Sequence, residues 1–116
     1  HMDISLLHTI TEPTKFHIIK LLMQHNYCVR ALSKKLDISE PAVSQQLNIL
    51  KKTGIISGKK IGYQMHYQVN VSLIEETVNI LLSCFKERAA LPVVDADCSC
   101  EFASSCIRYN NDRGNR

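Results

Sequence analysis

The chain has 116 residues, which is enough for one well-buried domain and too few for two. Apolar residues make up 45% of it and charged residues 22%, an ordinary globular composition that excludes a wholly disordered, collagen-like or coiled-rod chain. The apolar runs are too short to span a membrane, and no charged segment followed by an apolar signal core opens the chain. We therefore expect a cytoplasmic protein that does not contact a membrane.

The net charge of +3 conceals two parts of opposite sign. Residues 1–70 carry nine Lys and Arg against four Asp and Glu, whereas residues 71–116 carry five against seven. A polyanion would dock on the basic part. The acidic part is expected to serve another purpose.

The beginning of the chain predicts three short helices. Residues 3–10 are amphipathic, and Thr11 with Pro13 predicts a second helix, since threonine caps helices and proline is tolerated in the first turn. The apolar side chains of this second helix fall at helical spacing: Phe16, Ile18, Ile19, Leu22 and Met23. A third helix is expected from about Cys28 to Leu36.

The segment from Ser39 to Gly54 is the most informative one. Ser39 is expected to cap a fourth helix and Gly54 to end it. Three apolar residues at i, i+4 and i+7 form a buried stripe: Val43, Leu47 and Leu50. The open face keeps polar and basic residues: Ser44, Gln45, Asn48, Lys51 and Lys52. Two short helices joined by a tight turn, the second with a polar face and a basic end, describe a helix-turn-helix.

A hairpin and a long helix are expected next. Residues 55–60 and 63–69 are strand-like, and the second run alternates apolar and polar residues with period two. A hairpin directly after a recognition helix is a wing. Residues 71–88 form one long amphipathic helix, and its apolar stripe is too wide for a surface helix of so small a domain. We expect this stripe to pack against a second copy of the chain.

These elements define the expected fold class, which is mainly α with a small β-hairpin. We expect a winged helix-turn-helix for DNA binding and dimerisation over residues 1–88, and a cysteine-containing C-terminal extension over residues 89–116.

Three segments in this order resemble the ArsR/SmtB family of winged-helix repressors: EPTKFHIIKLL, CVRALSKKLDISEPAVSQQLNILKKTGII and GKKIGYQMHYQVN. The resemblance covers about residues 5–87. It implies a homodimer built on the first and last helices, operator binding by the fourth helix and the wing, and release when an inducer binds. It also implies a repressor and not an enzyme. No paired carboxylates, Cys-His arrangement or Gly-rich phosphate loop stands out in the sequence.

The candidate DNA contacts lie on the fourth helix and the wing. Gln and Asn pair bidentately with adenine and Ser hydroxyls reach bases or phosphates, although any solvated helix face carries such residues. The family's DNA-facing positions correspond here to Ser39, Pro41, Ser44, Gln45 and Gln46. Lys59, Lys60 and Tyr63 on the wing would reach the backbone or the minor groove. Glu40 departs from the family, which often has Gln there; a carboxylate is unfavourable near phosphates but can accept from a cytosine amino group.

Three thiols within nine residues form the candidate metal site: Cys98, Cys100 and Cys106. Soft thiolates select soft ions, and three of them suit As(III) or Sb(III), or Cd(II) or Pb(II) with a further ligand. Cys28 is the fourth candidate, because the family's thiolate metal sensors carry Cys-Val-Cys where this chain has Cys28-Val29-Arg30. The alternatives are a tail whose cysteines have no role and a Cys28 that is merely a small buried residue.

Two further residue types bear on the inducer. Zinc-sensing members carry an Asp-x-His…His pattern on the last helix, and residues 72–88 contain no histidine, so this zinc site is not expected. Cys84 is expected in the core or in a dimer interface. The sequence thus predicts a dimeric repressor released from its operator by a soft metal or metalloid. The alternatives are a thiol redox or persulfide sensor and an interaction module that lost DNA binding.

Overall fold

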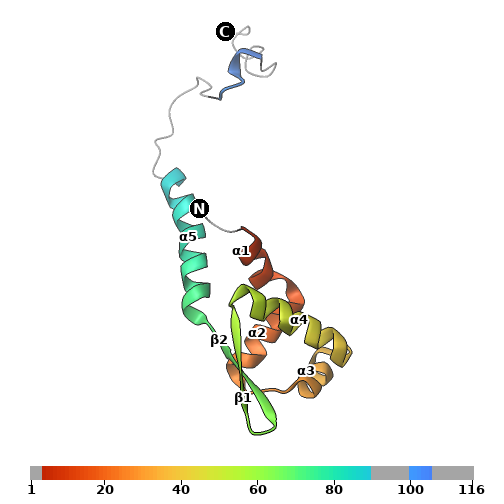
Figure 1. The fold of residues 1–116 in the computed structure, drawn as a ribbon. Helices are drawn as coiled ribbons and strands as arrows, with labels where there is room; N and C mark the ends of the chain where they lie inside the picture. The colour runs from red at the N-terminus through yellow and green to blue at the C-terminus, as the bar shows by residue number, and fades with distance from the viewer. Residues whose placement is uncertain (1–3, 90–99, 106–116) are drawn as a thin grey trace. The chain divides into compact units, whose positions relative to one another are not determined.

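The computed structural model describes residues 4–89 and 100–105 (Figure 1). The chain divides into two compact units, His1–Lys86 and Glu87–Arg116. Its elements in chain order are α1 (Ile4–Thr11), α2 (Pro13–Gln24), α3 (Val29–Leu36), α4 (Glu40–Thr53), β1 (Ile56–Ile61), β2 (Gln64–Val69), α5 (Val71–Ala89) and a 3-10 turn, η1 (Ala103–Ser105). None of the helices among the described residues has the length and apolar character needed to cross a membrane.

The cap of α2 differs from the sequence expectation. The Glu12 carboxylate accepts hydrogen bonds from the backbone N–H groups of Lys15 at 2.9 Å and Thr14 at 3.2 Å. The bond from the Lys15 amide is the largest cause of the lowered pKa of Glu12. Thr11 ends α1, where its hydroxyl donates to the carbonyl of Leu7. The prediction that Thr11 caps α2 is therefore wrong, because one carboxylate satisfies two of the amides that the first turn leaves unpaired.

One continuous core joins α2, α3, α4 and the start of β1. Its most deeply buried side chains are Ile18, Leu32, Val43, Leu47, Leu50, Ile55 and Ile56. The apolar stripe predicted on α4 is confirmed. The apolar face predicted for α2 is confirmed only in part. Phe16 and Met23, predicted on this face, are 48% and 58% exposed, whereas Leu21, which was not predicted there, is buried. A helix packed from one side buries one face, and these two residues lie off it.

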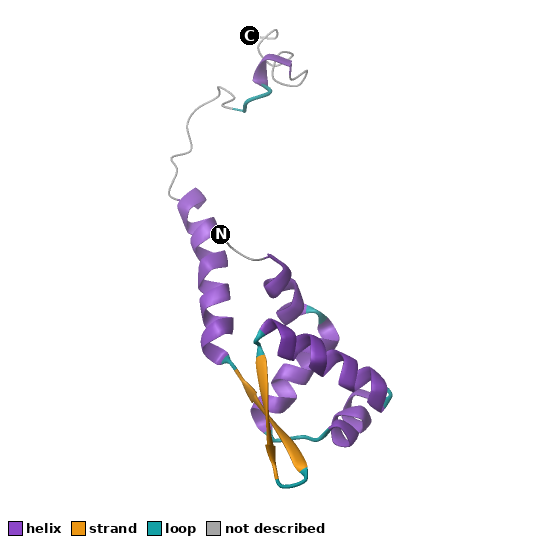
Figure 2. Cartoon of the chain, viewed as in Figure 1, coloured by secondary structure: helices purple, strands orange, loops and turns teal. Residues whose placement is uncertain are grey.

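The wing is a two-stranded antiparallel sheet that follows α4 directly (Figure 2). Its register runs from Ile56 opposite Val69 to Ile61 opposite Gln64. Gly62 is the first residue of the two-residue turn between the strands. Its φ of 64° is typical of this position in tight hairpins, and glycine adopts positive φ values without steric cost. The hairpin predicted from the period-two alternation is confirmed: β1 lies one residue later than predicted, and β2 begins one residue later and ends at Val69 as predicted.

The long helix α5 is buried only at its start. Asn70 caps it by accepting from the backbone N–H of Leu73 at 3.1 Å, and Thr77 is 5% exposed. Beyond Thr77 several large apolar side chains are open to solvent: Val78, Ile80, Leu82 and Phe85, the last 67% exposed. Cys84 is also exposed, so its placement in the core is wrong and only the interface expectation remains.

Candidate nucleic-acid interface

A tight turn sets α4 against α3. Asp37 adopts a left-handed conformation with a φ of 55°, which Asp tolerates better than most residues, and its backbone N–H donates to the carbonyl of Ser33. The Ser33 hydroxyl donates to the carbonyl of Ile38. These bonds close the end of α3 and direct the chain into α4. The two helices then share the buried residues Leu32 and Val43, as a helix-turn-helix requires.

The exposed face of α4 lies opposite its buried stripe. It carries most of the predicted contacts together with the basic end of the helix: Pro41, Ser44, Gln45, Asn48, Lys51 and Lys52. Ser39 is also exposed, and its hydroxyl accepts from the backbone N–H of Ala42 at 3.2 Å. From Ser44 to Lys52, one side of the helix is therefore polar and rich in hydrogen-bonding groups.

Gln46 occupies a different position from the other predicted contacts. It lies at the edge of the buried stripe, three residues after Val43, and is half-buried. Its Oε1 atom is buried and has no hydrogen-bond partner among the described residues. The family resemblance places Gln46 with Gln45 among the DNA-facing positions, although the helical period separates the two side chains by about 100°.

The wing presents three predicted contacts to solvent. Lys59 and Lys60 are exposed and stand opposite His66 and Met65 in the register. Because side chains alternate along a strand, the two lysines project from opposite faces of the hairpin. Tyr63 sits at the tip with its side chain fully exposed.

No carboxylate in the described part of the chain forms an ion pair with the lysines of α4 or the wing. Among residues 4–89 and 100–105, the structure has one ion pair, between Lys15 and Glu12 on α2. Lys51 places its ammonium 5.9 Å from the centre of the Tyr67 ring, a cation–π contact that links the end of α4 to β2. Burial of Tyr67 raises the pKa of its hydroxyl. This link between the recognition helix and the wing was not foreseen from the sequence, because nothing in the spacing of the two residues reveals it.

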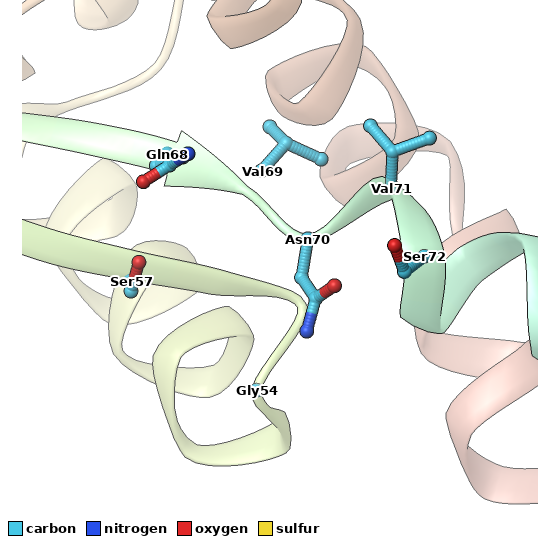
Figure 3. Close-up of a pocket in the computed structure, with 7 residues that line it drawn as sticks. All are labelled: Gly54, Ser57, Gln68, Val69, Asn70, Val71 and Ser72. Carbon is cyan, nitrogen blue, oxygen red and sulfur yellow. The ribbon is translucent and has the colours of Figure 1, made fainter.

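The wing joins α5 at a polar pocket of about 400 Å³ (Figure 3). Its lining residues are Gly54, Ser57, Gln68, Val69, Asn70, Val71 and Ser72. Ser57 and Gln68 face each other across the two strands, and Asn70 forms the single-residue connection to α5. The pocket carries no charged side chain.

The predicted thiol ligands are described only in part. Cys98 and Cys106 lie outside the described residues. Cys100 is exposed, and its sulfur accepts from the backbone N–H of Phe102 at 3.4 Å. Cys28 caps α3 without a side-chain hydrogen bond and is exposed, so its interpretation as a buried core residue is wrong.

The described thiols do not form a complete metal site. In the two described ranges, no three His, Cys, Asp or Glu side chains come together as a metal site would need. Cys28 also borders a pocket of about 280 Å³ together with Tyr63, Met65 and Tyr67 of the wing. Any inducer site built from the tail thiols remains a prediction.

A tight helix-turn-helix with an exposed polar face, followed at once by a basic hairpin, defines a winged helix-turn-helix protein. Residues 12–57 match the family described as "Bacterial regulatory protein, arsR family". The chain is 30% identical over 74 residues to the transcriptional repressor SdpR of Bacillus subtilis (strain 168), covering 64% of this chain and 82% of the relative. It is 27% identical over 81 residues to the biofilm growth-associated repressor of Xylella fastidiosa (strain Temecula1), covering 70% of this chain and 71% of the relative.

A solved structure shares the fold. The ArsR-like transcriptional regulator from Rhodococcus sp. RHA1 superimposes with a TM-score of 0.68 at 21% identity, covering 73% of this chain and 78% of that chain. The chain belongs to the ArsR/SmtB family. It is a transcriptional repressor and not an enzyme, as the family resemblance implied.

Proposed function

We propose that this repressor binds operator DNA as a homodimer, through the exposed face of α4 and the wing. We further propose that a soft metal or metalloid of the arsenite type, bound by cysteine thiolates, releases it. The observation that carries the DNA-binding proposal is the exposed polar face of α4, which ends in lysines that no described carboxylate neutralises.

The geometry of α4 suits the major groove. A helix of 14 residues is about 21 Å long, and a groove about 12 Å wide admits a helix with its side chains. Gln45 and Asn48 carry amide groups that can pair bidentately with adenine, while Lys51 and Lys52 at the other end suit phosphates. The face therefore combines base-reading groups with backbone-binding charge.

The wing adds a second set of contacts. Since Lys59 and Lys60 project from opposite faces of the hairpin, a wing laid along a groove would direct one lysine toward each flanking phosphate backbone. Tyr63, at the tip of the wing, would reach deepest into this groove. Each lysine that meets a phosphate releases condensed counterions and makes binding dependent on salt.

The exposed apolar part of α5 supports the homodimer. Val78, Leu82 and Phe85 are separated by helical spacing and form one exposed apolar stripe. A second copy of the chain would cover this stripe with an identical one, since a two-fold interface brings the same surfaces together. A helix-turn-helix dimer also presents its two recognition helices to successive half-sites, which a monomer cannot do.

The thiols support an inducer of the soft-ion class. Three thiols within nine residues can reach one ion without rearranging the core: Cys98, Cys100 and Cys106. Trivalent arsenic or antimony accepts three thiolates, and Cd(II) or Pb(II) would need a further ligand such as Cys28. The tail follows α5 directly in the chain, so an ion bound there can act on the dimer helix. Such an ion lowers the affinity for DNA only if it binds the DNA-free repressor more tightly than the DNA-bound repressor.

Competition between ions tests the inducer. Arsenite, antimonite, Cd(II), Pb(II) and Zn(II) are titrated separately onto the protein–DNA complex, with all thiols kept reduced. We expect release by arsenite or antimonite at about one ion per chain and no release by Zn(II). If no ion releases the DNA but a mild oxidant or a persulfide donor does, the thiol-sensing alternative replaces the metal proposal. If the chain binds no DNA at any salt concentration, the interaction-module alternative replaces both.

A further inference from the structure

Glu40 is an acidic residue on the otherwise polar and basic exposed side of α4. It is the first residue of the helix, is exposed, and makes no ion pair with any described residue. It does not serve as the helix cap, because the Ser39 hydroxyl already accepts from the amide of Ala42. A carboxylate in the first turn of a helix interacts favourably with the helix dipole, but this stabilisation is small when the carboxylate is exposed. Its place on the recognition helix therefore needs a further reason.

The start of α4 is closed to phosphate. Helix N-termini often bind DNA phosphates through unpaired backbone N–H groups. Here Pro41 has no N–H, the amide of Ala42 donates to the Ser39 hydroxyl, and the amide of Val43 donates to the Ser39 carbonyl at 3.0 Å. The remaining first-turn amide belongs to Glu40 itself, beside a carboxylate that repels anions. This end of the helix thus has little to offer the backbone.

We propose that Glu40 reads the exocyclic amino group of a cytosine in the major groove and so specifies a C·G pair in each half-site. This inference rests on the proposed binding of DNA through α4. The N-terminal residues of a recognition helix contact base edges, and Glu40 lies one turn before Ser44 on the same side of the helix. An ionised carboxylate only accepts hydrogen bonds, and cytosine presents a donor, its N4 amino group, at the major-groove edge.

The same carboxylate discriminates against other bases. Guanine presents two acceptors and thymine an acceptor and a methyl group, so both oppose a carboxylate. Adenine has one amino group, but its N7 acceptor stands beside it. On DNA without cytosine at this position, the carboxylate would lose water and approach phosphates without gaining a hydrogen-bond donor. Glu40 therefore lowers affinity for random DNA as well as raising it for the preferred site.

Binding-site selection tests this proposal. The full chain and the variants Glu40→Gln and Asp37→Asn each select ligands from a pool of randomised duplexes. Asp37→Asn is the matched control, since it removes one negative charge near the same turn and asparagine tolerates the left-handed conformation. We expect the unaltered chain and Asp37→Asn to enrich one C·G pair per half-site. We expect Glu40→Gln to lose that preference, to accept A·T there, and to bind random DNA more tightly.

An atomic substitution in the DNA provides the second readout. The selected cytosine is replaced by 2-pyrimidinone, which lacks the amino group. Affinity of the unaltered chain should fall about tenfold, and affinity of Glu40→Gln should change far less. Identical base preferences in the unaltered chain and Glu40→Gln, or equal weakening of Glu40→Gln on every sequence, overturn the inference while leaving DNA binding intact. A chain that selects no sequence at all overturns the proposed function and this inference with it.

Discussion

Asn26 Nδ2 lies 2.7 Å from Nδ1 of His66, forty residues further along the chain. The contact joins the segment between α2 and α3 to β2, so it ties the wing to the helix-turn-helix. Donation by the Asn26 amide requires an unprotonated Nδ1 on His66. The relative placement of the two proposed DNA-binding parts thus depends on one side-chain pair as well as on the core.

Removing this tether should weaken the wing. His66→Ala leaves the Asn26 amide without its partner in a part-buried position, and we expect a loss of about 1 kcal/mol in the free energy of unfolding. Urea denaturation measures it, and faster amide exchange in β2 would accompany it. Gln64→Ala, an exposed change on the same strand, is the control. Equal stability of the two variants would show that the pair contributes nothing.

Gln45 should be a base-specific contact. Gln45→Ala removes an amide from the exposed face of α4, and we expect the preferred site to lose about 1–3 kcal/mol of binding free energy while random DNA is affected little. Fluorescence anisotropy with a selected and a scrambled duplex measures both. Similar losses on the two duplexes would reduce Gln45 to a backbone contact. Gln46→Ala offers the comparison within the motif, since that side chain is half-buried.

The wing lysines should contribute to salt dependence and not to sequence preference. In the double variant Lys59→Ala, Lys60→Ala we expect the affinity to fall for all DNA sequences. The slope of log affinity against log salt concentration should become less steep by the contribution of up to about two phosphate contacts. Lys20→Ala, on the exposed side of α2, should leave the slope nearly unchanged. An unaltered slope in the double variant would place the wing away from DNA.

Local patterns in the sequence predicted the helix-turn-helix well. The stripe of Val43, Leu47 and Leu50 follows the helical period, and the apolar–polar alternation in the sequence of β2 follows the period of a strand, so both can be found without tertiary knowledge. The contacts of Asn26 with His66 and of Lys51 with Tyr67 could not be found in this way. They depend on how separate elements pack, and neither residue pair has a characteristic spacing.

The interpretation of single residues was less accurate. Thr11 and Glu12 both suit a helix start, and in the structure the carboxylate of Glu12 accepts the hydrogen bonds from the first-turn amides of α2. Gln46 stays a predicted DNA contact through the family resemblance alone, because the open face predicted from the helical period does not include it and the structure places it half-buried. Residue type alone does not reveal these differences.

The exposed stripe of α5 should hold the dimer together. Phe85→Glu places a charge in the proposed apolar interface, and we expect it to convert a dimer into a monomer at micromolar concentration. Sedimentation velocity measures the mass. Ser83→Glu is the control, because Ser83 lies about 100° or more around α5 from Val78, Leu82 and Phe85, outside the stripe. A dimer that persists in Phe85→Glu would mean that another surface pairs the chains.

The tail thiols should act in release and not in DNA binding. Replacing Cys98, Cys100 and Cys106 together by Ser should leave operator affinity intact and abolish release by arsenite. Because each ligand must lose a proton, release of the unaltered complex should need more arsenite as the pH falls below the effective pKa of the thiols. Cys84→Ser is the control. If the triple variant still leaves DNA at the usual arsenite concentration, Cys28 becomes the leading ligand.

The most direct test of the central claim compares two duplexes of equal length. One carries the sequence that the chain selects from a random pool, and the other carries the same bases scrambled. At physiological salt we expect two chains per selected duplex and an affinity at least about a thousandfold above that for the scrambled one. Equal affinity for the two duplexes, unchanged by Gln45→Ala, would contradict sequence recognition through α4.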